Sequence, residues 1–117
     1  LKDAIRQWAN VGALVHALHE KDAELFGLSL QDHIVEPHRS KLIPGFNSIR
    51  DAALGEGALG CGISGSGPSI FAFSKDMETA EKVKSKFKYI YSKTSIPYEV
   101  YTSVINEEGI KILNTDL

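Results

Sequence analysis

A glycine-rich stretch near the middle of the chain has the residue types that could bind an anion. It runs from Gly60 to Gly67 and reads Gly-Cys-Gly-Ile-Ser-Gly-Ser-Gly. Glycine tolerates positive φ angles and lets a ligand come close to the backbone, and successive backbone amides can converge on one anion. The same residues also suit a tight bend packed against a neighbouring element, in which Ser64 and Ser66 bond to their own backbone. From the residues alone, both interpretations stay open.

Two common nucleotide-binding turns are excluded by the context of this stretch. Its first six residues match the G-x-G-x-x-G pattern of dinucleotide-binding proteins, in which a strand precedes the glycines and a helix follows them. Here the glycines are followed by Pro-Ser-Ile-Phe-Ala-Phe over residues 68–73, which is typical of a strand. A phosphate loop ending in Gly-Lys-Ser or Gly-Lys-Thr is also absent, because no lysine follows the glycines.

Arg39 is the second residue whose type and place could do chemistry. It lies in the segment 36–46, which contains two prolines and a glycine and is predicted to be an ordered loop rather than a regular element. The planar fork of a guanidinium suits bidentate capture of a carboxylate. The alternative is a local surface ion pair with Glu36 or Asp32, which would be worth little.

The elements that must position these residues are helices first and strands later. The apolar periodicity predicts helices at 4–19, at 22–36, in a short stretch after Phe46 that ends at Gly55 or Gly57, and at 76–91. Strands are expected at 58–63, 68–74, 98–105 and 110–113, the last two as a hairpin. This order predicts an α+β fold, with helices on one face of a mostly antiparallel, four-stranded sheet.

The inner faces of the helices are also predicted by spacing. Residues on the inner faces of the third and fourth helices are expected in the core, namely Ile49, Ala52, Ala53, Ala80, Val83, Phe87 and Tyr91. The first helix is expected to pack through its apolar stripe, which consists of Ile5, Trp8, Val11, Val15 and Leu18. Trp8 is therefore interpreted as a core residue.

Composition limits the partners of the chain. Its 117 residues are 43% hydrophobic and 24% charged, as in one ordinary globular domain, and the formal net charge is −2 without a basic block. Nucleic acid is therefore not expected as a partner. No apolar run of about 18 residues and no signal segment occurs, so no membrane partner is expected and a cytoplasmic location is predicted. The single Cys61 and the four histidines are interpreted as packed or solvated residues, with no metal site.

Two motifs resemble those of a known family. The segment 62–72, Gly-Ile-Ser-Gly-Ser-Gly-Pro-Ser-Ile-Phe-Ala, closely resembles the third motif of the GHMP kinases, which phosphorylate small molecules such as galactose, homoserine and mevalonate. The segment 36–46, Glu-Pro-His-Arg-Ser-Lys-Leu-Ile-Pro-Gly-Phe, resembles the homoserine kinase branch of that family. The Gly-Pro within the segment 62–72 resembles the same branch. The two motifs stand in the order the family has, and the resemblance covers nearly the whole chain.

The resemblance implies a ferredoxin-like C-terminal GHMP kinase domain over residues 1–117. It implies that Arg39 binds the carboxylate of L-homoserine, and that the glycine motif lies beside the phosphate loop and the substrate, with Ser64, Gly65, Ser66 and Gly67 in shaping roles. The family's phosphate loop, Pro-x-x-x-Gly-Leu-Gly-Ser-Ser-Ala, does not occur in this sequence. ATP, Mg²⁺ and the catalytic groups are therefore expected on an N-terminal domain outside these residues, and the chain alone is expected to be inactive, with no cofactor bound.

Three alternatives remain open at this point. The chain could belong to another GHMP kinase, although the Glu-Pro-x-Arg segment favours the homoserine branch. It could be a free-standing ferredoxin-like module that binds an amino acid and regulates another protein, because such folds often bind ligands without catalysis. It could also be a structural dimerisation domain, and a homodimer is compatible with each of these interpretations.

Overall fold

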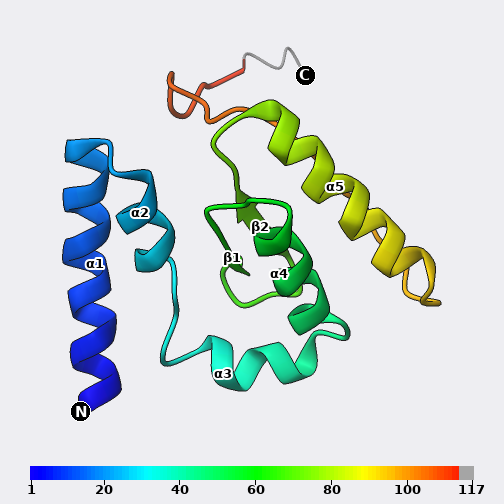
Figure 1. Ribbon diagram of the computed structural model, residues 1–117, viewed down its shortest axis with the longest axis horizontal. Helices are drawn as coiled ribbons and strands as arrows, with labels where there is room; N and C mark the ends of the chain where they lie inside the picture. Colours follow the sequence, from blue (N-terminus) through cyan, green and yellow to red (C-terminus); the bar gives the residue numbers. More distant parts are fainter. Residues whose placement is uncertain (114–117) are drawn as a thin grey trace.

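The computed structural model describes residues 1–113, so the last four residues of the predicted domain lie outside the described part (Figure 1). Figure 1 shows α1 and α2 on one side of a short pair of strands and α5 on the other. The elements in chain order are α1 Lys2–Glu20, α2 Ala23–Ser29, α3 Glu36–Arg39, the 3₁₀ turn η1 Ser40–Leu42, α4 Phe46–Gly55, β1 Gly60–Ile63, β2 Ile70–Phe73 and α5 Met77–Ser92. The α+β class is therefore confirmed. None of the helices in residues 1–113 is long and apolar enough to cross a membrane.

The two strands form an antiparallel hairpin whose faces differ in character. Because side chains alternate along a strand, residues directly opposite each other share a face. One face carries the opposed pairs Cys61 with Ala72 and Ile63 with Ile70, and the other carries Gly60 with Phe73 and Gly62 with Phe71.

Helices α4 and α5 cover the first face and make the core with it. Ile49 and Ala53 of α4 are fully buried, and they cluster with Cys61 of β1 and Val83 of α5. Helix α5 begins where predicted, because the Asp76 side chain accepts a hydrogen bond from a backbone amide at the start of the helix, 2.7 Å away. The predicted inner faces of both helices are confirmed at these positions.

Helix α2 contacts the other face of the hairpin. The rings of Phe26 and Phe73 meet edge to face with centroids 5.3 Å apart. The prediction that the helices lie on one face only is therefore wrong. The reason is that the strand glycines leave room for a helix: a Cβ at Gly60 would lie 2.5 Å from the side chain of Leu30.

Helix α1 has nearly the predicted extent but not the predicted packing. The predicted stripe is exposed, with Trp8 at 66%, and the other four residues of the stripe are more than half exposed as well. The helix instead packs through Ala17, which is buried, and through two polar side chains. Asn10 donates to the carbonyl of residue 31 at 2.8 Å, and Gln7 accepts from the amide of His33 at 2.9 Å. The interpretation of Trp8 as a core residue is therefore wrong, because the face of α1 that carries Trp8 is not the face that meets the rest of the chain.

The region between α2 and α4 also differs from the prediction. Helix α2 ends at Ser29, and the Asp32 carboxylate accepts hydrogen bonds from the three amides of residues 34–36. This cap starts the separate one-turn helix α3, with Pro37 in its first turn, where a missing N–H costs nothing. The predicted loop 36–46 therefore contains α3 and η1.

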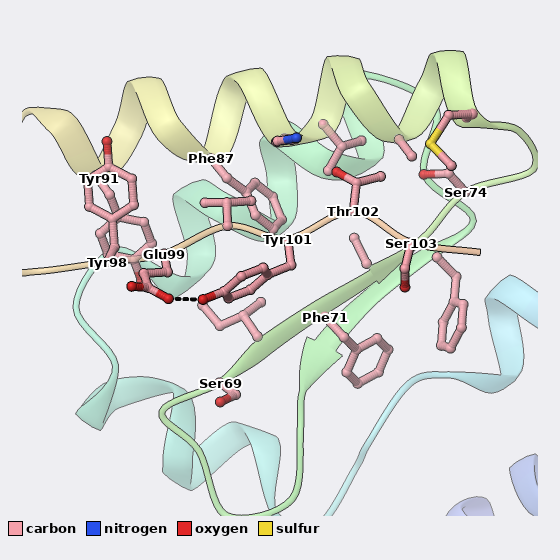
Figure 2. A pocket seen from close by; sticks show the side chains of 18 of the residues that line it. Ser69, Phe71, Ser74, Phe87, Tyr91, Tyr98, Glu99, Tyr101, Thr102 and Ser103 are labelled. Atoms are coloured by element: carbon pink, nitrogen blue, oxygen red, sulfur yellow. Dashed lines mark hydrogen bonds between the residues drawn. The ribbon is translucent and has the colours of Figure 1, made fainter. Parts of the chain in front are cut away.

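The predicted hairpin at 98–113 is absent from the structure, and the four-stranded sheet is not confirmed. No residue of this segment pairs in a ladder, and the described residues contain the strands β1 and β2 alone. Figure 2 shows the segment running between α5 and β2, with the Tyr98 side chain beside Tyr91 of α5. Tyr98 stacks on Tyr91 with centroids 5.7 Å apart and donates to the carbonyl of Lys88 at 3.2 Å. Residue 98 thus contacts α5 through its side chain, and the backbone hydrogen bonds expected between strands are not formed. Tyr101 is 82% exposed.

Candidate functional site

The two segments that sequence analysis singled out meet in space. Arg39, at the end of α3, donates a hydrogen bond from Nη2 to the carbonyl oxygen of Ser66 in the glycine-rich turn. Ile43, just after η1, packs against the same turn, since a Cβ at Gly67 would lie 3.1 Å from its Cδ1. We call this surface the arginine–glycine site, defined by Arg39, Ile43 and residues 64–67.

The turn itself is a tight connection between β1 and β2. The amide of Gly67 donates to the carbonyl of Ser64 at 3.1 Å, and the amide of Ser64 donates to the carbonyl of Ser69 at 2.8 Å. Gly65 and Gly67 have φ angles of 58° and 79°, which favour glycine. Within the described residues, the amides of Gly65 and Ser66 bond to no other backbone group. These two exposed amides are the groups of the turn that remain available to an anion.

A matched pair of substitutions tests how the turn is built. Gly67→Ala is expected to lower the free energy of unfolding by about 2 kcal/mol, because the positive φ disfavours a side chain and the new Cβ would press on Ile43. Gly65→Ala is expected to cost about 1 kcal/mol, since the φ penalty is similar but nothing lies within 4 Å of its Cβ. Urea denaturation of both variants checks this order, and a larger loss at Gly65 would contradict it.

Arg39 does not form the local ion pair that was the alternative to a binding role. Asp32 is occupied by backbone amides, and Glu36 pairs with Arg50 of α4, with Oε1 and Nη1 3.4 Å apart. Burial tends to raise the pKa of Asp32, but hydrogen bonds from the amides of residues 34–36 outweigh it and lower that pKa. The alternative is wrong for both carboxylates.

Glu36 lies close to Gly62 of β1, two residues before the glycine-rich turn of the arginine–glycine site. Its side chain is only 13% exposed, and a Cβ added at Gly62 of β1 would lie 3.3 Å from its Oε2. Burial raises the pKa of Glu36, and Arg50 opposes that shift. Sequence reasoning missed Arg50, because no spacing along the chain connects it with residue 36.

Cys61 lies on the same strand as Gly62, on the core side. Burial raises the pKa of the Cys61 thiol to about 12, the Glu36 carboxylate adds to the rise and Arg50 opposes it. The interpretation of Cys61 as a packed strand residue is confirmed. In the part of the chain that the structure describes, no three His, Cys, Asp or Glu side chains form a group that could hold a metal ion.

The buried thiol gives a prediction on reactivity. At about pH 8, iodoacetamide is expected to leave Cys61 unmodified in the folded protein and to label it fully in urea, because only the thiolate reacts. The unfolded thiol ionises near pH 8.5, so from there to about pH 12 the unfolded chain releases a proton that the folded chain keeps. Stability from this group therefore falls as the pH rises through that window. Mass spectrometry measures the labelling, and equal rates in both states would contradict the prediction.

Comparison with known proteins decides the family. The family described as "GHMP kinases C terminal" matches residues 14–93, which is more than half of the chain. The chain belongs to the GHMP kinases. The family assignment that the two motifs suggested is thereby confirmed, and the matched residues of this GHMP kinase chain include both motifs of the arginine–glycine site.

Three proteins similar to this GHMP kinase chain are each named homoserine kinase. Homoserine kinase of Chlorobium phaeovibrioides (strain DSM 265 / 1930) is 51% identical over 115 residues, covering 97% of the chain and 36% of that protein. Homoserine kinase of Chlorobaculum tepidum is 45% identical over 117 residues, covering 98% and 36%. A crystal structure of homoserine kinase from Cytophaga hutchinsonii ATCC 33406 has a TM-score of 0.87 at 52% identity, covering 92% of the chain and 34% of that protein. The chain thus spans about a third of the length of the relatives it matches.

Proposed function

We propose that these residues form the C-terminal domain of a homoserine kinase, which transfers the γ-phosphate of ATP to the side-chain hydroxyl of L-homoserine in threonine biosynthesis. The observation that carries the proposal is the contact between Arg39 and the glycine-rich turn. It joins the two motifs into one site, in a chain that is 45% to 52% identical to proteins named homoserine kinase.

The role of this site in the proposed reaction is to hold the substrate. Arg39 lies at the end of a one-turn helix with its guanidinium at the exposed turn, where it can bind the carboxylate of the amino acid through two hydrogen bonds. Gly65 and Ser66 are exposed in the same turn, and their amides, which make no backbone hydrogen bond within residues 1–113, offer further donors to an anionic group. Fixing the carboxylate orients the far end of the substrate, where the hydroxyl would be phosphorylated.

The residues of this chain do not fit the nucleotide and metal side of the reaction. In the described residues no three His, Cys, Asp or Glu side chains come together in a group that could hold a metal ion, and the sequence has no Pro-x-x-x-Gly-Leu-Gly-Ser-Ser-Ala phosphate loop. As the family resemblance implies, we assign the binding of ATP and Mg²⁺ to residues outside this sequence, and we assign no catalytic step to this chain.

The proposal extends to the rest of the fold and to the location. Residues 98–105 and 110–113 pair with no strand in this structure, but their alternating pattern suits strands, and we propose that they complete a ferredoxin-like sheet in the full-length protein. A cytoplasmic location suits an enzyme that uses ATP and whose buried Cys61 is a free thiol. A homodimer remains compatible with this arrangement.

The decisive experiment uses the full-length protein. The reading frame is extended upstream of Leu1, and the complete protein is assayed for ATP- and Mg²⁺-dependent phosphorylation of L-homoserine, galactose and mevalonate. We expect a Gly-Leu-Gly-Ser-Ser loop in the upstream sequence and phosphorylation of L-homoserine. Phosphorylation of another substrate in its place would contradict the proposal and favour another GHMP kinase.

The free-standing regulatory module is distinguished by a second measurement. Isothermal titration of the 117-residue chain with L-homoserine and L-threonine is expected to show no binding at millimolar ligand, because a single arginine and two amides would hold the amino acid. Tight binding of either amino acid to this chain would favour the module over the kinase domain.

A further inference from the structure

Glu36 is the only carboxylate in the described part of the chain whose contacts reach from α3 to both α4 and the hairpin strand β1. Its Oε1 lies 3.4 Å from Nη1 of Arg50, and its Oε2 would lie 3.3 Å from a Cβ added at Gly62. A side chain at position 62 would press on the Phe71 ring, 3.1 Å from its Cβ, and on the Glu36 carboxylate, so the glycine leaves room for both groups. Both contacts are well shielded, since the Glu36 side chain is 13% exposed.

Arg50 is itself held in place, so it can serve as a fixed anchor. Its guanidinium carbon lies 5.8 Å from the ring centroid of Phe46, which is almost fully buried at the start of α4. Its Nε lies 3.6 Å from the carboxylate of Asp51. Helix α4 contributes Ile49 and Ala53 to the buried core, so Glu36 connects α3 with a helix of that core.

Helix α3 needs such an anchor because it is too short to hold its own orientation. A single turn of four residues is not stable by itself, and its direction depends on contacts at its ends. Asp32 fixes the amides at its start, but those bonds do not determine which way the side chains project. Glu36 and Arg39 are three residues apart and therefore share one face of the turn, and both contact the hairpin, at Gly62 and Ser66 respectively.

We propose that Glu36 is a positioning residue for substrate binding. Its contact with Arg50 and its position beside Gly62 fix the rotation of α3. The Arg39 guanidinium is thereby directed toward the glycine-rich turn and the substrate carboxylate. This inference rests on the proposed function. Glu36 touches no substrate atom in this scheme and acts through Arg39 alone.

The test uses full-length enzyme carrying Glu36→Gln, which keeps the size of the side chain and removes its charge. The KM for L-homoserine is expected to rise on the order of tenfold, with kcat and the KM for ATP changed by less than about twofold. The preference for L-homoserine over its carboxamide analogue is expected to fall by a similar factor, because Arg39 would no longer be held for a carboxylate. Arg50→Gln breaks the same pair from the other side and is expected to give the same changes.

Epistasis separates positioning from a general loss of stability. In an Arg39→Ala background, Glu36→Gln is expected to have no further effect on the KM for L-homoserine, because its effect passes through Arg39. The matched control is Glu56→Gln, which removes another ion pair of the fold, 3.2 Å from Lys86, away from the arginine–glycine site. This control is expected to leave the KM for L-homoserine unchanged.

The outcomes that overturn the inference are distinct from those that overturn the proposed function. An unchanged KM for L-homoserine in Glu36→Gln and Arg50→Gln overturns the positioning role, as does a full additional effect of Glu36→Gln in the Arg39→Ala background. Failure of the wild-type enzyme to phosphorylate L-homoserine overturns the function itself. If Glu36→Gln does not yield folded protein, the comparison of Arg50→Gln with Arg39→Ala decides the positioning role.

Discussion

Arg39→Ala in the full-length protein is expected to raise the KM for L-homoserine by about 100-fold. Two charge-assisted hydrogen bonds to a carboxylate contribute roughly 3 kcal/mol, and each 1.4 kcal/mol corresponds to a factor of ten. The loss of the bond from Arg39 to Ser66 acts in the same direction, because the turn then lacks its contact with α3. Steady-state kinetics with varied L-homoserine at saturating ATP measures the effect.

Two further variants show whether charge or shape carries the Arg39 effect. Arg39→Lys keeps the positive charge but loses the planar fork, and its KM for L-homoserine is expected to rise by about tenfold. Arg6→Ala is the control, because Arg6 is an exposed arginine on α1 whose nearest carboxylate, that of Asp3, is 3.9 Å away. An unchanged KM for L-homoserine in Arg39→Ala, or an equal rise in the KM for ATP, would contradict the assignment of Arg39 to the substrate carboxylate.

The parts of the fold that could be predicted from sequence are those that local rules determine. Helix α5 begins after the side-chain cap of Asp76, and α4 turns Ile49 and Ala53 inward at helical spacing. The strands β1 and β2 flank a turn whose glycines adopt positive φ. In each case, the information lies within a few residues of the element, so it is readable along the chain.

The sequence predictions that were wrong concern which face of a helix or strand packs against which neighbouring element. The stripe of α1 has the spacing of a buried face, yet Trp8 is exposed because the helix meets the rest of the chain through another face, which carries the buried Ala17 and the hydrogen-bonded Asn10. The segment 98–105 has a strand pattern, but a strand also needs a neighbouring edge, and Tyr98 contacts α5 instead. Patterns along the chain indicate that a face can be buried, and only the three-dimensional arrangement decides what buries it.

The candidate site divides in the same way. Sequence analysis identified Arg39 and the glycine-rich turn separately, and the structure brings them together through a contact that spans 27 residues. It could not identify the Glu36–Arg50 pair, because the two residues lie on different helices and no spacing along the chain connects Arg50 with the Glu-Pro-x-Arg segment. It also could not foresee that Asp32, a plausible partner of Arg39, is used to start α3.

Gly27→Ala is expected to destabilise the fold by about 3 kcal/mol or more. Gly27 lies inside α2, and a Cβ there would be 2.1 Å from the carbonyl oxygen of Leu59, the residue before β1. That backbone cannot yield easily, because the amide of Leu59 donates to the carbonyl of Phe73 at 2.7 Å. Helix α2 would have to move off the hairpin, which separates Phe26 from Phe73. For a domain of this size, the melting temperature is expected to fall by roughly 10 °C or more.

Gly12→Ala is the matched control for this prediction, and its sign is opposite. Gly12 is also inside a helix, but it is exposed on α1 and a Cβ there meets nothing within 4 Å. Alanine has the higher helix propensity, so Gly12→Ala is expected to stabilise the chain by about 0.5–1 kcal/mol and to raise the melting temperature by a few degrees. Because the propensity gain is the same at both positions, the difference between the two variants isolates the clash with Leu59. Thermal unfolding followed by circular dichroism measures it, and a rise in melting temperature for Gly27→Ala would show that α2 does not pack against the start of β1.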